Sequence, residues 1–127
     1  MNSNKQKYLN LIPAFIVMSV IWVSSSTPGY VINNAGLGSN KLHVSGHSLI
    51  FFLLCFCVYK AKKNVLFSII FSILYAVIDE LNQSFTPLRS ASLFDILVDA
   101  IGIVLAGLIL WKLQPIMPTK LKVWLNK

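Results

Sequence analysis

Hydrophobic residues fall into four long runs separated by short polar stretches. The runs cover residues 8–25, 42–59, 65–81 and 92–113. About 20 apolar residues are needed to cross the roughly 30 Å hydrocarbon core of a bilayer, so the pattern predicts four membrane-spanning helices. The second run is short for a span, and its helix must recruit residues near Lys41 and His43. That extension places His47 inside the helix.

The polar stretches between the runs have the composition of turns and helix ends. Residues 26–40 contain the pair Pro28-Gly29 and predict a turn-forming connector, and KAKKN at 60–64 predicts a tight basic turn. Ser92 suits a helix N-cap, with Asp95 in the first turn, where a negative charge favours the helix dipole. The expected fold is all-α: a polytopic membrane protein with four transmembrane helices in a compact bundle, forming one domain over residues 1–127.

Composition supports the membrane class over a soluble or nucleic-acid-binding one. The chain is 56% hydrophobic and only 12% charged, against roughly 25% charged residues in a soluble domain. Its net charge is +7, but the lysines flank apolar runs and form no stripe that would follow a nucleic acid. The expected partner is therefore the lipid bilayer. The first run also fits a signal peptide, yet the later runs favour an uncleaved first anchor.

The basic residues are distributed unequally between the two ends of the expected bundle. One end holds both termini and the turn after the second run, with nine basic residues, and the other holds two, Lys41 and Arg89. Basic residues concentrate on the cytoplasmic side of membrane proteins. The expected topology therefore has both termini in the cytoplasm.

Every acidic residue of the chain, together with its only arginine, lies between Tyr75 and Gly102: these are Asp79, Glu80, Arg89, Asp95 and Asp99. A charged side chain in a bilayer costs about 2.5–3.5 kcal/mol on insertion scales and marks a functional-site candidate. Residues three or four apart share a helix face. Asp79 with Gln83, and Asp95 with Asp99, are thus expected to converge with His47 at the outer ends of three spans.

This stretch, YAVIDELNQSFTPLRSASLFDILVDAIG, resembles the signature of the VanZ-like family. That signature has an Asp-Glu-x-x-Gln at the end of one span, a Pro-Gly-Arg-Ser loop, and an Asp-x-x-x-Asn/Asp-x-x-Gly that opens the next span. The upstream Lys41-Leu42 and Gly46-His47 resemble the family's entry to the second span. The resemblance covers residues 41–107, over half of the chain.

The positions that match the family motif are His47, Asp79, Glu80, Gln83, Arg89, Asp95 and Asp99. Leu88 departs from the pattern by replacing the usual glycine before the arginine, and Asn82 stands where a histidine is common. The resemblance implies a protein of the bacterial cell envelope in the cytoplasmic membrane. For the family's namesake it implies antibiotic resistance, through reduced susceptibility to the glycopeptide teicoplanin. It supplies no molecular activity.

The residue types suggest a site on the outer face that acts on, or binds, an anionic envelope lipid or cell-wall precursor. Arg89 and Lys41 are expected to clamp the anionic group. The binding set is Arg89, Lys41, Gln83 and Asp99. The catalytic candidates are Glu80 and Asp79 as general acid or base, with His47 and Asp95. The oxygen ligands allow Mg²⁺ or Ca²⁺, but no spacing assigns a metal or other cofactor.

Other functions are open on the sequence alone. The charged residues could form an interhelical network that only fixes the bundle, in a non-catalytic scaffold or partner-binding protein. Chains of carboxylates and histidines also serve as ion or proton paths in membranes. Whether the protein is an enzyme, its oligomeric state and its protein partners do not follow from these residues.

The predicted topology can be tested by cysteine labelling in intact cells. A membrane-impermeant maleimide should label Gly38→Cys, in the outer connector, and should leave Lys62→Cys unlabelled, because the positive-inside rule assigns the 60–64 turn to the cytoplasm. Labelling of both in lysed cells is the control. Labelling at position 62 in intact cells contradicts the topology.

Overall fold

The computed structural model describes residues 3–34, 40–89, 92–113 and 116–126, and among them it covers no side chain at positions 3, 4, 7, 40–45, 113 or 126. These described residues form helices and no strand, which confirms the all-α prediction. The helices are α1 (Ser3–Ser26), α2 (Gly29–Asn34), α3 (Asn40–Lys62), α4 (Val65–Ser84), α5 (Leu93–Leu108), which continues as a π-helical turn (Ile109–Leu113), and α6 (Thr119–Asn126).

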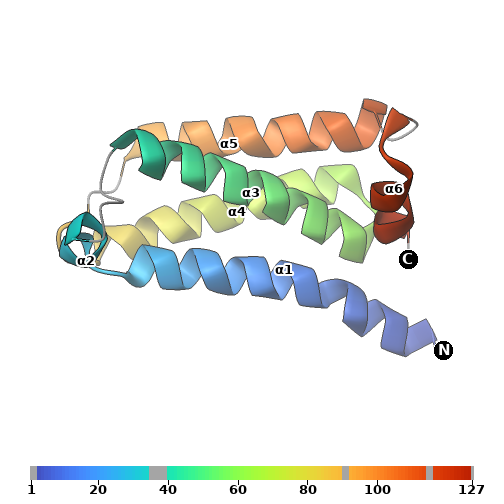
Figure 1. Cartoon of the computed structure of the whole chain (residues 1–127), viewed down its shortest axis with the longest axis horizontal. Coiled ribbons are helices and arrows are strands. Elements are labelled where there is room, and N and C mark those ends of the chain that lie inside the picture. The colour runs from blue at the N-terminus through green and yellow to red at the C-terminus, as the bar shows by residue number, and fades with distance from the viewer. Residues whose placement is uncertain (1–2, 35–39, 90–91, 114–115, 127) are drawn as a thin grey trace.

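Four long helices lie side by side and alternate in direction (Figure 1). Both ends of the chain lie at one end of this bundle, together with the α3–α4 turn and α6. The opposite end carries α2 and the loop between α4 and α5. The predicted connector at 26–40 thus contains a short helix, α2, that the Gly and Pro content did not suggest. Its backbone is joined to the other loop, since Gly29 N donates to Pro87 O at 3.1 Å.

Three of the helices are long and apolar enough to span a membrane: residues Tyr8–Ser26, Val65–Ser84 and Leu93–Lys112. The fourth long helix, α3, has 23 residues and packs against α1, α4 and α5. These findings make the chain a membrane protein in contact with lipid.

Helix α4 has the inside-out polarity of a membrane helix. Its buried residues are small or polar and recur at steps of three or four: Ser68, Ser72, Ala76, Asp79, Glu80 and Gln83. As far as Leu81, its exposed residues are large and apolar: Leu66, Phe67, Ile70, Leu74, Val77, Ile78 and Leu81. In a bilayer the polar face must turn to the bundle interior because lipid offers no hydrogen bonds.

Local capping groups determine where α4 and α5 begin. The side chain of Asn64 accepts from Phe67 N at 2.9 Å and caps α4. The Ser92 hydroxyl accepts from Phe94 N at 3.2 Å and caps α5, with Asp95 in the first turn, as the sequence predicts. Lys63 ends α3 in a left-handed conformation, with φ of 54°, and its N–H donates to Tyr59 O at 2.7 Å. Such a residue commonly closes a helix.

Helix α6 packs onto the bundle at the end that holds the chain termini. Lys60 Nζ donates to Trp124 O at 2.6 Å and lies 4.1 Å from the centroid of the Trp124 ring. Lys63 Nζ donates to Leu125 O, and Leu125 is fully buried. The two ammonium groups therefore meet the carbonyl end of α6, where a cation is favoured by the helix dipole.

Helices α3 and α5 are in close contact at Gly102. A Cβ at this position would lie 2.5 Å from Ser48 O and 2.6 Å from Ser48 Oγ. The Ser48 hydroxyl donates to Val98 O at 3.1 Å across the same contact. Small residues that let helix backbones approach are typical of membrane helix packing.

We predict that Gly102→Ala destabilises the bundle by about 1–3 kcal/mol, because its methyl group forces the backbone of α3 away from α5. Gly46→Ala is the matched control, since a Cβ there meets no atom within 4 Å and replaces a glycine within a helix. It should stabilise by about 0.5–1 kcal/mol. Thermal unfolding in detergent, followed by circular dichroism, measures both. Equal shifts for the two variants would show that the contact at Gly102 does not limit packing.

Candidate functional site

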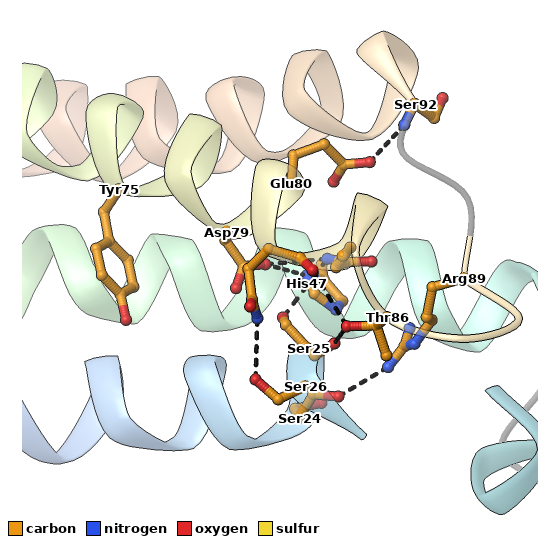
Figure 2. Close-up of polar contacts among 12 residues, drawn as sticks. Ser24, Ser25, Ser26, His47, Tyr75, Asp79, Glu80, Thr86, Arg89 and Ser92 are labelled. Atoms are coloured by element: carbon orange, nitrogen blue, oxygen red, sulfur yellow. Dashed lines mark hydrogen bonds and ion pairs between the residues drawn. The ribbon is translucent and has the colours of Figure 1, made fainter. Parts of the chain in front are cut away.

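Polar side chains gather at the end of the bundle that carries α2, opposite the chain termini. They come from the end of α1, the first half of α3, the last turns of α4 and the loop that follows it. Figure 2 shows His47 and Asp79 between the helices, with Arg89 reaching from the loop towards α1. Four separate segments of the chain thus contribute to one cluster.

The centre of the cluster is an imidazole beside a buried carboxylate. His47 Nδ1 lies 3.8 Å from Asp79 Oδ2, with 12% and 2% of the two side chains exposed. Gln83 Nε2 donates to the same Asp79 oxygen at 3.0 Å. Asp79 and Gln83 are one turn apart on α4, so the amide fixes the carboxylate on the face that meets α3. The predicted sharing of a face by these two residues is confirmed.

Helix α1 contributes residues that the sequence argument did not assign to the site. Ser25 is fully buried, and its hydroxyl is 3.5 Å from Gln83 Nε2. The Thr86 hydroxyl donates to Ser25 O at 3.1 Å. The Asn82 amide donates to Ser26 Oγ at 3.0 Å, so this departure from the family pattern joins α4 to α1. The signal available was the polar run at 24–27, at the same predicted depth as the acidic residues.

Arg89 joins the α4–α5 loop to the carbonyl end of α1. Its Nη2 donates to Ser24 O at 2.8 Å and its Nε donates to Thr27 O at 3.3 Å. A cation at a helix C-terminus is favoured by the dipole. Desolvation lowers the pKa of Arg89 from its ordinary value, while the charges of Asp79 and Glu80 act to raise it.

Glu80 points away from Asp79, towards the start of α5 (Figure 2). Its Oε1 accepts a hydrogen bond from Ser92 N. Ser92 is the N-cap of α5. The backbone N–H groups at the start of a helix have no partner within that helix, and the Glu80 carboxylate accepts from one of them. Adjacent residues of one helix thus make contacts on two sides of α4.

The two aspartates of α5 differ in exposure. Asp95 is partly exposed in the first turn of α5. Asp99 lies one turn deeper and is 3% exposed. Its Oδ1 has no hydrogen-bond partner among the described residues. Its carboxyl lies within electrostatic range of those of Asp79, Glu80 and Asp95.

Lys41 falls in the first turn of α3, but its side chain lies outside the described part of the structure. Its expected place beside Arg89 is therefore not described. Within the ranges 3–34, 40–89, 92–113 and 116–126, no group of three or more His, Cys, Asp or Glu side chains is arranged to hold a metal ion. His47, Asp79, Glu80, Gln83, Arg89, Asp95 and Asp99 lie at the same end of the bundle.

A family model described as VanZ/LLP1 matches residues 1–115, well over half of the 127-residue chain. The chain belongs to the VanZ/LLP1 family. The resemblance inferred from residues 41–107 is confirmed, and the family match also takes in α1, which contacts the cluster through Ser25. Comparisons with curated proteins and with solved structures gave no match. The chain is thus a VanZ-like membrane protein, and α6 lies beyond the matched residues.

The departure at Leu88 from the usual family pattern has a visible conformational consequence. Leu88 has φ of 57°, a left-handed conformation that glycine adopts without cost and other residues adopt at about 1–2 kcal/mol. Its side chain is 77% exposed. The loop backbone also packs against Gly29, where a Cβ would lie 2.1 Å from Leu88 O. The turn is therefore maintained although its expected glycine is absent.

We predict that Leu88→Gly stabilises the protein by a net of about 0.5–1 kcal/mol, because relief of the left-handed strain exceeds the entropy that glycine adds to the unfolded chain. Leu88→Ala is the control: it removes the exposed side chain but keeps the strain, so it should give no gain. Melting temperatures in detergent compare the two variants. A gain shared by both would assign the effect to the leucine side chain.

Proposed function

We propose that the bundle spans the bacterial cytoplasmic membrane four times, with α3 as the fourth span and both termini in the cytoplasm. The length of α3 and its packing among three span-capable helices support this topology. The distribution of charge supports the orientation, because nine of the eleven basic residues belong to the end that carries the termini. In this orientation the polar cluster faces the outer side of the membrane.

We further propose that the cluster binds or acts on the anionic headgroup of an envelope lipid or cell-wall precursor, and so affects glycopeptide susceptibility. The observation that carries the proposal is the His47–Asp79 pair. A carboxylate beside one ring nitrogen orients an imidazole, as in enzymes that use histidine as a base. In the pair, Nδ1 of the His47 ring faces Oδ2 of Asp79 at 3.8 Å.

The surrounding groups suit a headgroup that carries both phosphate and hydroxyl groups. Arg89 and Lys41 supply positive charge for a phosphate. Asp95 and Asp99 supply acceptors for hydroxyl groups such as those of a sugar, and Asp99 Oδ1 has acceptor capacity that the described protein atoms leave unused. Gln83 holds Asp79 in position. If the protein is an enzyme, Asp79 and Glu80 act with His47 as acid–base groups.

The alternative is a scaffold or partner-binding protein in which the charges are structural. Two contacts favour this reading for part of the set. Arg89 donates to α1 carbonyls, and Glu80 accepts from the N–H of Ser92. Both contacts close the backbone at the outer end of the bundle and require no ligand. We therefore assign the ligand-directed role first to His47 and Asp79.

The two functions predict different outcomes for His47→Gln and Asp79→Asn. A ligand site should lose function, by roughly 10²–10⁴-fold if His47 is an acid–base catalyst, while membrane abundance stays normal. A purely structural pair should lose abundance in each single variant, since removal of one partner of a buried pair costs about 3–5 kcal/mol, and should recover in the double variant. The measurements are membrane abundance by immunoblot and glycopeptide susceptibility of the expressing strain.

Two further variants complete the experiment. Asn82→Ala removes a polar contact to α1 near the cluster and should leave susceptibility unchanged. Arg89→Lys keeps the charge but loses the planar guanidinium. It should reduce abundance if the role of Arg89 is to hold α1, and should raise glycopeptide susceptibility at normal abundance if its role is to bind the ligand. Normal abundance with normal susceptibility in both His47→Gln and Asp79→Asn would refute the proposed site.

A further inference from the structure

An apolar groove of about 280 Å³ lies between α4 and α5, at the end of the bundle opposite the polar cluster. Val65, Leu66 and Ile69 line it from α4, and Val104, Gly107 and Trp111 are among the residues that line it from the other side. A Cβ at Gly107 would lie 2.4 Å from Ile69 Cδ1. Because glycine has no Cβ, the Ile69 side chain can pack directly against α5 in this wall of the groove. Leu66 and Trp111 are both exposed, and the groove therefore opens on the lipid-facing surface.

Two lysines contact aromatic rings that line this groove or follow a lining residue in the sequence: Trp111 lines it, and Phe67 follows Leu66. Lys112 Nζ lies 5.2 Å from the centroid of the Trp111 ring, and Lys62 Nζ lies 5.6 Å from that of Phe67. Both rings are exposed on the outer surface, so these contacts direct the ammonium groups towards the bilayer. Lys63 is instead engaged with Leu125 O of α6. The positive end of the α4 dipole lies at the same rim.

The positive charge at this rim is not balanced by carboxylates. All four acidic residues of the chain lie between positions 79 and 99, at or towards the opposite end of the bundle. A lysine near an anionic lipid surface contributes about 1 kcal/mol of attraction. An occupant that complements both the apolar groove and the two lysines must have an apolar chain and a negatively charged group.

We propose that this groove binds one acyl chain of an anionic phospholipid, whose phosphate headgroup lies against Lys62 and Lys112. The proposal requires that the bundle spans a bilayer and is independent of any ligand at the polar cluster. A zwitterionic lipid would fill the groove without using the excess positive charge. A helix from a second copy would fill it with no need for the lysines.

The test is native mass spectrometry of the purified full-length protein with equimolar phosphatidylglycerol and phosphatidylethanolamine of identical acyl chains. The protein should retain phosphatidylglycerol preferentially. Lys62→Gln with Lys112→Gln should weaken phosphatidylglycerol binding by roughly 30-fold, at about fivefold for each lysine, and should leave phosphatidylethanolamine binding unchanged. Lys5→Gln with Lys120→Gln removes the same charge from two exposed lysines on other helices and should change neither.

A second pair of variants tests the groove itself. Val104→Trp fills it and should weaken binding of both lipids, whereas Ile101→Trp, on the exposed surface of the same helix but outside the groove, should not. Circular dichroism confirms that each variant is folded. Equal retention of the two lipids by the unmodified protein, an equal effect of the two lysine pairs, or a dimer that retains no lipid would each overturn the proposal.

Discussion

The constraint on which this structure depends is that lipid offers no hydrogen bonds to a polar group. The chain meets it by turning polar and small side chains inward and large apolar ones outward, most clearly along α4. The interior is consequently a place where carboxylates, an imidazole and hydroxyls can be held at fixed positions. The same constraint explains the close contacts at Gly102, because packing between helices in lipid relies on backbone approach more than on the hydrophobic effect.

The end of the bundle that carries α2 is closed largely through contacts between side chains and backbone. Arg89 holds the carbonyl end of α1, Glu80 holds the N–H of Ser92, and Thr86 donates to Ser25 O. Each pairs a helix terminus with a residue of another segment, so the loop after α4 is joined to α1 and the last turns of α4 are joined to the start of α5. These contacts join α1, which lies within the family match, to the end of α4 and the loop that follows it.

Much of this arrangement follows from the sequence, and the exceptions have a physical cause. The hydrophobic runs predicted the long helices, and the three- and four-residue spacings placed Asp79 and Gln83 on one face. Helix α2 was not predicted because six residues give too short a pattern to reveal a period. The contribution of Ser25 was missed because neutral hydroxyls cost little in an apolar run and so give no signal of burial. The left-handed Leu88 was foreseen only as a departure from glycine, since a leucine does not indicate positive φ.

The charged residues of the motif fall into two sets that differ in the groups they contact. Arg89 and Glu80 satisfy backbone groups at helix ends, and these contacts have a structural role. His47 and Asp79 contact each other and a side-chain amide, and Asp99 is buried with an acceptor unused by the described residues. Replacement of buried charges by apolar residues of similar size is often neutral or stabilising. Buried charges are therefore a costly way to obtain stability alone. His47, Asp79 and Asp99 are the groups on which the proposed ligand site depends.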